Sequence, residues 1–262
     1  MEYFGYFASI LIGITLGLIG GGGSILTVPI LVYLFQIDPE NATSYSLFIV
    51  GITALVGSYR HYKLGNLQLK SALYFAIPSV FSLLFVRKLV LPNIPETLFS
   101  IQRLEVTKNL LIMIIFAILM MAASVSMIRK SNGEEIKSTR NIPRLAFIGF
   151  LVGFVTGFLG AGGGFLIIPA LLFFANLSMK QAVGTSLFII FINSLIGFTG
   201  DLLSGITINY QLLFTITSIA IVGMLIGTQL SKKIDGVKLK PAFGWFVLVM
   251  GIYIISKELF LK

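Results

Sequence analysis

Two glycine-rich stretches decide how this chain of 262 residues folds: GLIGGGGSILTVP at 17–29 and GFLGAGGGFLIIP at 157–169. They match in one register and without a gap. The register holds further along the chain, because SLFI recurs at 46–49 and at 186–189. Chance does not keep one register through glycines, a proline and a tetrapeptide, so the chain consists of two related halves.

The composition indicates the class of protein. Hydrophobic residues make up 56% of the chain and charged residues 11%, whereas a soluble domain carries about 25% charged residues. The apolar residues form continuous runs, which excludes a soluble enzyme, a coiled coil and the alternating pattern of a membrane β-barrel. We therefore predict an all-α polytopic membrane protein. The chain has no cysteine, which excludes disulfides, thiolate metal sites and thiol catalysis.

Each half contains five apolar segments. They span about 3–20, 25–36, 42–60, 67–90 and 107–129, and then about 144–160, 165–175, 182–200, 207–230 and 240–260. The first two segments of each half lie in a long charge-free stretch, 3–37 or 145–179, which exceeds the length of one membrane span. Glycine costs a helix about 1 kcal/mol relative to alanine, so the glycine runs predict a break followed by a half-helix.

The basic residues predict how the halves are oriented. Loops around 60–70, 129–144 and 232–240 are basic and should be cytoplasmic, whereas the loops with Asp38 and with Asp201 should lie outside. These sides agree if the first two segments form a hairpin within the membrane or if both cross it, because each half then crosses an odd number of times. We therefore predict two inverted-topology repeats of about five helical segments each, with both termini outside. The repeats are 1–130 and 144–262, joined by a cytoplasmic linker at 131–143.

One region disagrees with this count. The stretch between the fourth and fifth segments is assigned outside, yet it carries Arg87, Lys88, Arg103 and Lys108. Pro92 and Pro95 are followed by an amphipathic run at 96–107, which we interpret as a short interfacial helix. His61, the only histidine, follows the third segment in a basic loop and is predicted to be solvated.

The glycine breaks predict an anion site. The first N–H groups of a half-helix lack intrahelical partners and carry the positive end of the helix dipole. Inverted repeats would bring two such ends together near mid-membrane without a neutralising carboxylate. The site residues are Gly21, Gly22, Gly23, Ser24 and Ile25 in the first half, and Gly162, Gly163, Gly164 and Phe165 in the second. We expect alanine at Gly23 or Gly163 to weaken anion binding without unfolding the protein. Close helix packing through glycines is the alternative.

The third segment of each half adds polar candidates. Ser46 and Thr53 share one helix face, and their repeat mates are Ser186 and Asn193. Their hydroxyl and amide groups could complete the coordination of an anion, although interhelical hydrogen bonds explain them equally well. Thr185, beside Ser186, is a further candidate, with N-capping as its alternative.

These motifs resemble the sulfite exporter TauE/SafE family of membrane permeases. The resemblance is carried by the two glycine motifs with Pro29 and Pro169, by AVGTSL at 182–187 and by RHYKLGN at 60–66. It implies transport of a small sulfur-containing anion, such as sulfite or an organosulfonate, across the plasma membrane. An anion-selective channel and a non-transporting membrane scaffold remain alternatives.

The sequence also limits other functions. An intramembrane enzyme is not predicted, because no histidine and carboxylate cluster lies within the apolar segments. No cofactor and no nucleic-acid partner are expected, since the net charge of +9 comes from basic residues in membrane loops. The lipid bilayer is the expected surrounding. The coupling ion, proton or sodium, and the oligomeric state stay open.

Overall fold

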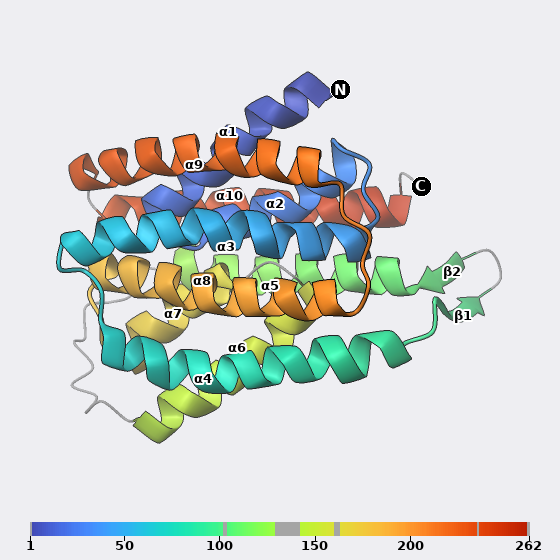
Figure 1. The fold of residues 1–262 in the computed structure, drawn as a ribbon, viewed down its shortest axis with the longest axis horizontal. Coiled ribbons are helices and arrows are strands. Elements are labelled where there is room, and N and C mark those ends of the chain that lie inside the picture. The colour runs from blue at the N-terminus through green and yellow to red at the C-terminus, as the bar shows by residue number, and fades with distance from the viewer. Residues whose placement is uncertain (1, 102–103, 129–141, 160–162, 235, 261–262) are drawn as a thin grey trace.

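The computed structural model describes residues 2–101, 104–128, 142–159, 163–234 and 236–260, and helices account for most of them (Figure 1). The first half contains α1 (Glu2–Ile19), α2 (Gly22–Tyr33), α3 (Pro39–Lys63), α4 (Leu69–Phe85) and α5 (Lys108–Ile128). The second half contains α6 (Ile142–Leu159), α7 (Gly164–Phe174), α8 (Met179–Leu203), α9 (Tyr210–Lys233) and α10 (Gly236–Phe260). Each predicted apolar segment overlaps one of these helices, so the all-α architecture is confirmed.

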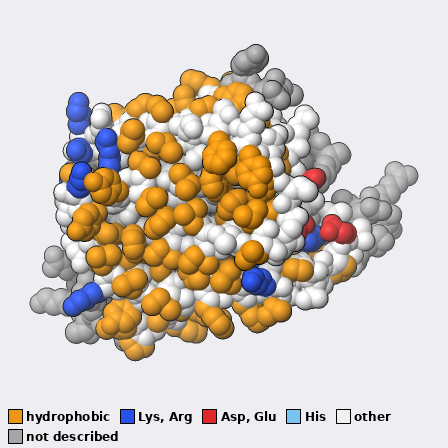
Figure 2. Space-filling view, in the orientation of Figure 1, with side chains coloured by type: hydrophobic (Ala, Val, Ile, Leu, Met, Phe, Trp, Pro, Cys, Tyr) orange, Lys and Arg blue, Asp and Glu red, His pale blue; other side chains and the backbone are white. Residues whose placement is uncertain are grey.

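The surface of the helix bundle suits a bilayer. Within the described residues, five helices are long and apolar enough to cross a membrane, namely α3, α4 with its extension to Asn93, α6, α8 and α9. Large apolar side chains on their outer faces are exposed, such as Ile77 at 67% and Phe81 at 68%. Figure 2 shows apolar side chains across the middle of one face, most Lys and Arg at the left end, and Asp and Glu at the right.

Helices α1 and α2 form a hairpin. Gly20 has φ +78°, a conformation that favours glycine, and the chain reverses there between the two helices. The rings of Tyr6 near the start of α1 and Phe35 just after α2 lie 5.4 Å apart, so the helices run antiparallel. Helices α6 and α7 repeat this arrangement, since the guanidinium of Arg144 lies 5.0 Å from the ring of Phe174. Helix α1 begins and α10 ends at the same end of the bundle (Figure 1).

The halves pack against each other through reciprocal helix pairs. Helix α1 lies along α9 and α6 lies along α4, while α3 packs on α8 and α5 on α10. Glycines bring the first two pairs close together. A Cβ atom on Gly13 would lie 1.9 Å from the carbonyl oxygen of Ala220, and one on Gly153 would lie 2.2 Å from that of Ser79. Close packing therefore explains these two glycines, which occupy equivalent positions in the two halves.

The region after α4 differs from the prediction. Helix α4 continues as a π-helical turn, Val86–Val90, and a 3-10 turn, Leu91–Asn93. The run at 96–107 then forms an antiparallel hairpin of β1 (Thr97–Ile101) and β2 (Leu104–Thr107), so the predicted interfacial helix is wrong. These short runs are rich in threonine, valine, isoleucine and phenylalanine, which favour strands, and they are too short for a stable isolated helix.

Candidate functional site

The starts of α2 and α7 meet in the middle of the bundle. A Cβ atom on Gly21 would lie 2.3 Å from the carbonyl oxygen of Gly164, and one on Gly164 would lie 2.6 Å from the Cα of Gly21. The two backbones therefore touch, and only glycine permits this contact. Neither helix start has a side-chain cap, and their N-cap residues are Gly21 and Gly163.

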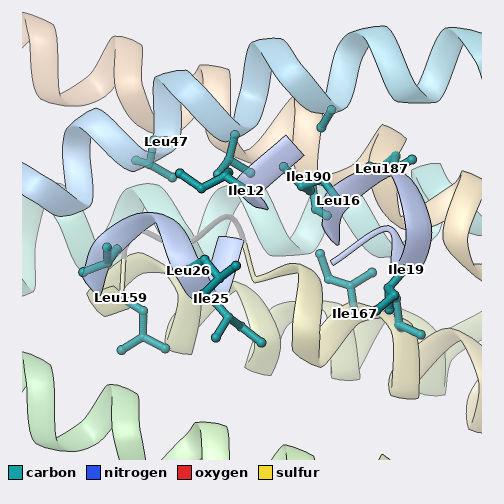
Figure 3. Packing of buried hydrophobic residues seen from close by; sticks show 14 of the residues in the cluster. Ile12, Leu16, Ile19, Ile25, Leu26, Leu47, Leu159, Ile167, Leu187 and Ile190 are labelled. Carbon is teal, nitrogen blue, oxygen red and sulfur yellow. The ribbon is translucent and has the colours of Figure 1, made fainter. Parts of the chain in front are cut away.

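Apolar side chains surround this meeting point. Figure 3 shows part of the buried apolar cluster, whose labelled members Ile12, Leu16, Ile19, Ile25, Leu26, Leu47, Leu159, Ile167, Leu187 and Ile190 belong to α1, α2, α3, α6, α7 and α8. Ile25, one of the predicted site residues, is fully buried, so only its backbone could meet a ligand. The first turn of α2 and that of α7 carry no acidic side chain. The positive ends of two helix dipoles thus lie in a low-dielectric interior without a neutralising carboxylate.

Ser186 is the polar candidate that contacts a break directly. Its hydroxyl donates to the carbonyl of Gly20 at 3.2 Å and to that of Val183 at 2.8 Å. Its repeat mate Ser46 is fully buried, and its Oγ has no hydrogen-bonding partner within the described part of the chain. A buried hydroxyl without a partner is costly, so Ser46 has a donor available for a ligand.

Thr53 and Asn193 lie further along α3 and α8, and both are fully buried. Thr53 donates to the carbonyl of Ile49 on its own helix at 2.6 Å. The Nδ2 of Asn193 donates to the hydroxyl of Ser79 on α4 at 2.7 Å, while its Oδ1 has no partner in the described segments. Asn193 therefore makes the interhelical bond that was the alternative explanation for this stripe, and Thr53 does not.

Thr185 has a different role in this structure. Its hydroxyl accepts a hydrogen bond from the backbone N–H of Gln68 at 3.1 Å and so anchors the loop before α4. Tyr45, its repeat mate in the first half, does the same at the other end by accepting from the N–H of Asn209 at 2.6 Å. The structure therefore connects Thr185 to a loop rather than to the helix starts.

Some predicted site residues are placed only in part. Gly162 and the side chains of Ser24 and Phe165 lie outside the described residues, and Gly22 is seen only as the first residue of α2. A Cβ atom on Gly23 would lie 2.2 Å from the carbonyl oxygen of Ile12. At Gly163, where φ is +68°, it would lie 2.0 Å from the Cγ2 of Thr156. Alanine at either glycine would therefore disturb local packing, and the expectation that these variants still fold stays a prediction.

A buried ion pair that the sequence did not reveal joins the halves at one end. The Nη1 of Arg87 donates to Asp201 and, at 3.2 Å, to the hydroxyl of Ser44, which itself donates to Asp201. The Nη2 of Arg87 donates to the hydroxyl of Thr43 at 3.1 Å. Arg87 is only 7% exposed. Both charged residues had been assigned to loops, because each stands at the end of an apolar run.

Lys108 is paired at the same end. Its Nζ lies 2.8 Å from a carboxylate oxygen of Glu40 and 3.9 Å from one of Glu96. Of the four basic residues that disagreed with the predicted orientation, Arg87 and Lys108 therefore have acidic partners. The positive-inside rule counts basic residues and not net charge, so this pairing gives the two residues a structural role but does not remove the disagreement.

His61 is buried, with 3% of its surface exposed, so the prediction that it is solvated is wrong. Helix α3 continues past it to Lys63, and the chain folds back so that the N–H of Asn66 donates to the carbonyl of His61 at 3.0 Å. Gly184 on α8 packs against this turn, because a Cβ there would lie 2.9 Å from the Cβ of His61. His61 lines a pocket of about 250 Å³ at this end of the bundle.

Apolar helices and a lipid-compatible surface define a polytopic membrane protein, in which the starts of α2 and α7 meet and carry no side-chain cap. A sequence model of the Sulfite exporter TauE/SafE family matches residues 6–254. This chain therefore belongs to that family, and its relatives carry the names of transporters.

Three relatives with transporter names are similar to this chain over most of its length. A probable membrane transporter protein of Xylella fastidiosa is 29% identical over 251 residues, covering 95% of this chain and 92% of the relative. The probable membrane transporter protein YdhB of Bacillus subtilis is 28% identical over 246 residues, covering 94% and 96%. The probable membrane transporter protein MJ0441 of Methanocaldococcus jannaschii is 27% identical over 263 residues, covering 94% of this chain and 92% of the relative. No solved structure matches the chain significantly.

Proposed function

We propose that this protein carries a small sulfur-containing anion, such as sulfite or an organosulfonate, across the plasma membrane by alternating access. The observation that carries the proposal is the contact between two helix starts without side-chain caps, at Gly21 and Gly164, in a buried centre. Backbone N–H groups at a helix start bind anions, and the dipole favours negative charge there. The family membership supports a transporter and is named for sulfite export.

The reciprocal helix pairs support two inverted repeats, each with a half-helix after its glycine break. Any two-fold relation exchanges α1 with α6 and α4 with α9, so the pair α1–α9 becomes α6–α4, as found, and the basic loops favour an inverted relation. The twelve residues of α2 and eleven of α7 correspond to about 18 Å and 16 Å of helix, less than the hydrocarbon thickness. Both helices are therefore proposed as half-helices that begin near mid-membrane.

The two ends of the bundle support alternating access. At the end with the acidic residues, proposed as outside, the buried Arg87–Asp201 pair joins α8 to the extension of α4. At the opposite end, proposed as cytoplasmic, the pocket beside His61 is lined by residues close to the α1–α2 break, including Leu18 and Val183. A pocket of about 370 Å³ also lies at the acidic end, beside Asp38 and Glu258, and we propose that the two pockets are vestibules on the two sides of the membrane.

The orientation is testable because the chain contains no cysteine. Single cysteines at Lys63 and Lys233 should react with an impermeant thiol reagent only from the cytoplasm, and those at Asp38 and Thr207 only from outside. All four positions are exposed, and none belongs to the Arg87 ion pair. Labelling of Lys63→Cys and Asp38→Cys from the same side would contradict the proposed topology.

The proposed transport can be measured in proteoliposomes. A carrier should take up sulfite with saturation and should show counterflow, in which unlabelled internal sulfite accelerates entry of labelled sulfite. A channel would give uptake without counterflow. Uptake of a cation that no anion affects would contradict the proposal.

Replacing Ser46 with alanine separates a ligand role from a structural one. The variant should remain as stable as the parent, because it removes a buried hydroxyl that has no partner among the described residues. If that hydroxyl binds the anion, the dissociation constant for sulfite should rise about five- to thirtyfold. Ser71→Ala is the matched control, since Ser71 is also buried and unpartnered within the described residues but lies at the start of α4. Equal sulfite affinity in both variants would remove Ser46 from the site.

A further inference from the structure

The ends of the bundle carry residues of different charge at corresponding positions. When the sequences of the two halves are aligned, Asp201 takes the position of His61, and Lys180 takes the position of Glu40. At the acidic end the guanidinium of Arg87 lies against Asp201, Ser44 and Thr43. Asp201, Ser44 and Thr43 therefore form a cation-binding site that is occupied by Arg87, a side chain of the protein itself.

The corresponding site at the other end of the bundle is a pocket that carries hydrogen-bond donors. His61, Asn66, Lys180, Ser231 and Lys232 line the pocket of about 250 Å³, together with five apolar residues. Among the residues that the structure describes, those lining the pocket include no acid. A water molecule takes up about 30 Å³ of liquid, so the pocket has room for an oxyanion with part of its hydration shell.

The imidazole of His61 supplies one of these hydrogen-bond donors, and this donor has no partner among the described residues. The Nδ2 of Asn66 lies 3.5 Å from the Nδ1 of His61, and we assign Nδ1 as the acceptor of this long contact. The hydrogen of the neutral imidazole then belongs on Nε2. This Nε2 is buried and has no hydrogen-bonding partner among the residues described. A donor buried in this way costs free energy unless a ligand accepts from it.

We propose that this pocket is a second anion site, a capture site at the cytoplasmic end for a tetrahedral or pyramidal sulfur oxyanion. His61 Nε2–H would donate to it, and the ammonium groups of Lys180 and Lys232 would balance its charge. Leu18 and Val183 connect the pocket to the α1–α2 break, because Val183 Cα lies 2.9 Å from the position of a Cβ on Gly20. This inference rests on the proposed anion transport but concerns different residues.

Protection of lysines from acetylation tests the site locally. Purified protein is treated with an acetylating reagent in sodium sulfate or in sodium chloride of equal ionic strength, and modified lysines are quantified by mass spectrometry. Saturating sulfate should slow the modification of Lys232 at least about fivefold relative to chloride. Lys233, its exposed neighbour outside the pocket, is the matched control and should react equally in both salts.

Two variants test the role of His61. His61→Leu should abolish the protection of Lys232, whereas His61→Gln should keep it, since the amide nitrogen of glutamine can donate from a place close to Nε2. Melting temperatures identify variants that fail to fold. Equal acetylation of Lys232 in both salts would overturn the inference, and so would unchanged protection in folded His61→Leu.

The outcomes separate this inference from the proposed function. Saturable counterflow of sulfite without protection of Lys232 would overturn the capture site and leave the transport proposal intact. Protection of Lys232 without transport of any anion would support the capture site and contradict the transport proposal.

Discussion

Replacing Asp201 with asparagine should lower the free energy of unfolding by about 3–5 kcal/mol, because it leaves the guanidinium of Arg87 buried without its counter-charge. The side chains of Arg87 and Asp201 are 4% and 13% exposed, so water cannot replace the lost partner. Thermal unfolding in detergent, followed by intrinsic fluorescence and by the loss of monodisperse protein, measures the effect.

A double variant makes this prediction specific. Replacing a buried ion pair with apolar residues of similar size is often neutral or stabilising, so Arg87→Met combined with Asp201→Leu should recover most of the loss. Glu96→Gln is the control, since Glu96 is 80% exposed and lies 3.9 Å from Lys108, and exposed pairs contribute about 0–1 kcal/mol. Asp201→Asn with unchanged stability would show that the pair is not a structural link between the halves.

Among additions of a single methyl group to the core, Gly21→Ala should be the most disruptive. Its Cβ would meet the backbone of Gly164, which cannot move away as a flexible side chain could. Overpacking of this kind costs about 1–3 kcal/mol and at times more, and here it would also separate the two helix starts. We expect Gly21→Ala to lose both stability and sulfite transport.

Gly200→Ala is the matched control for this substitution. Its Cβ would lie 3.2 Å from the Cδ2 of Leu84, a flexible side chain that can shift. We expect a change in melting temperature of a few degrees at most and normal transport. If Gly21→Ala is as stable and as active as Gly200→Ala, the helix starts do not meet in the folded protein as described.

The sequence predicted what depends on local pattern. Hydrophobic runs and glycine breaks located all ten helices that the described residues contain, because helix formation in a membrane follows from segment length and apolarity. The run at 96–107 was assigned wrongly, since so short an apolar pattern does not distinguish a helix from a strand.

Contacts between distant residues could not be predicted. Arg87 and Asp201 lie 114 residues apart, and each looked like an ordinary loop charge at the end of an apolar run. The burial of His61 depends on the turn at Asn66 and on Gly184 of the other half. For the candidate site, the sequence identified the glycines at the helix starts, but their contacts with Ile12 and Thr156 required the structure.

The Arg87–Asp201 pair also has a consequence for biosynthesis. The ribosome makes Arg87 long before Asp201, and membrane segments leave the translocation machinery in chain order. During this interval the guanidinium has no carboxylate from α8, so its long side chain must reach the headgroup region, where charge is tolerated. Only after α8 is inserted can Arg87 enter the interior. A chain truncated just before α8 should therefore be retained by quality control as an incompletely assembled intermediate.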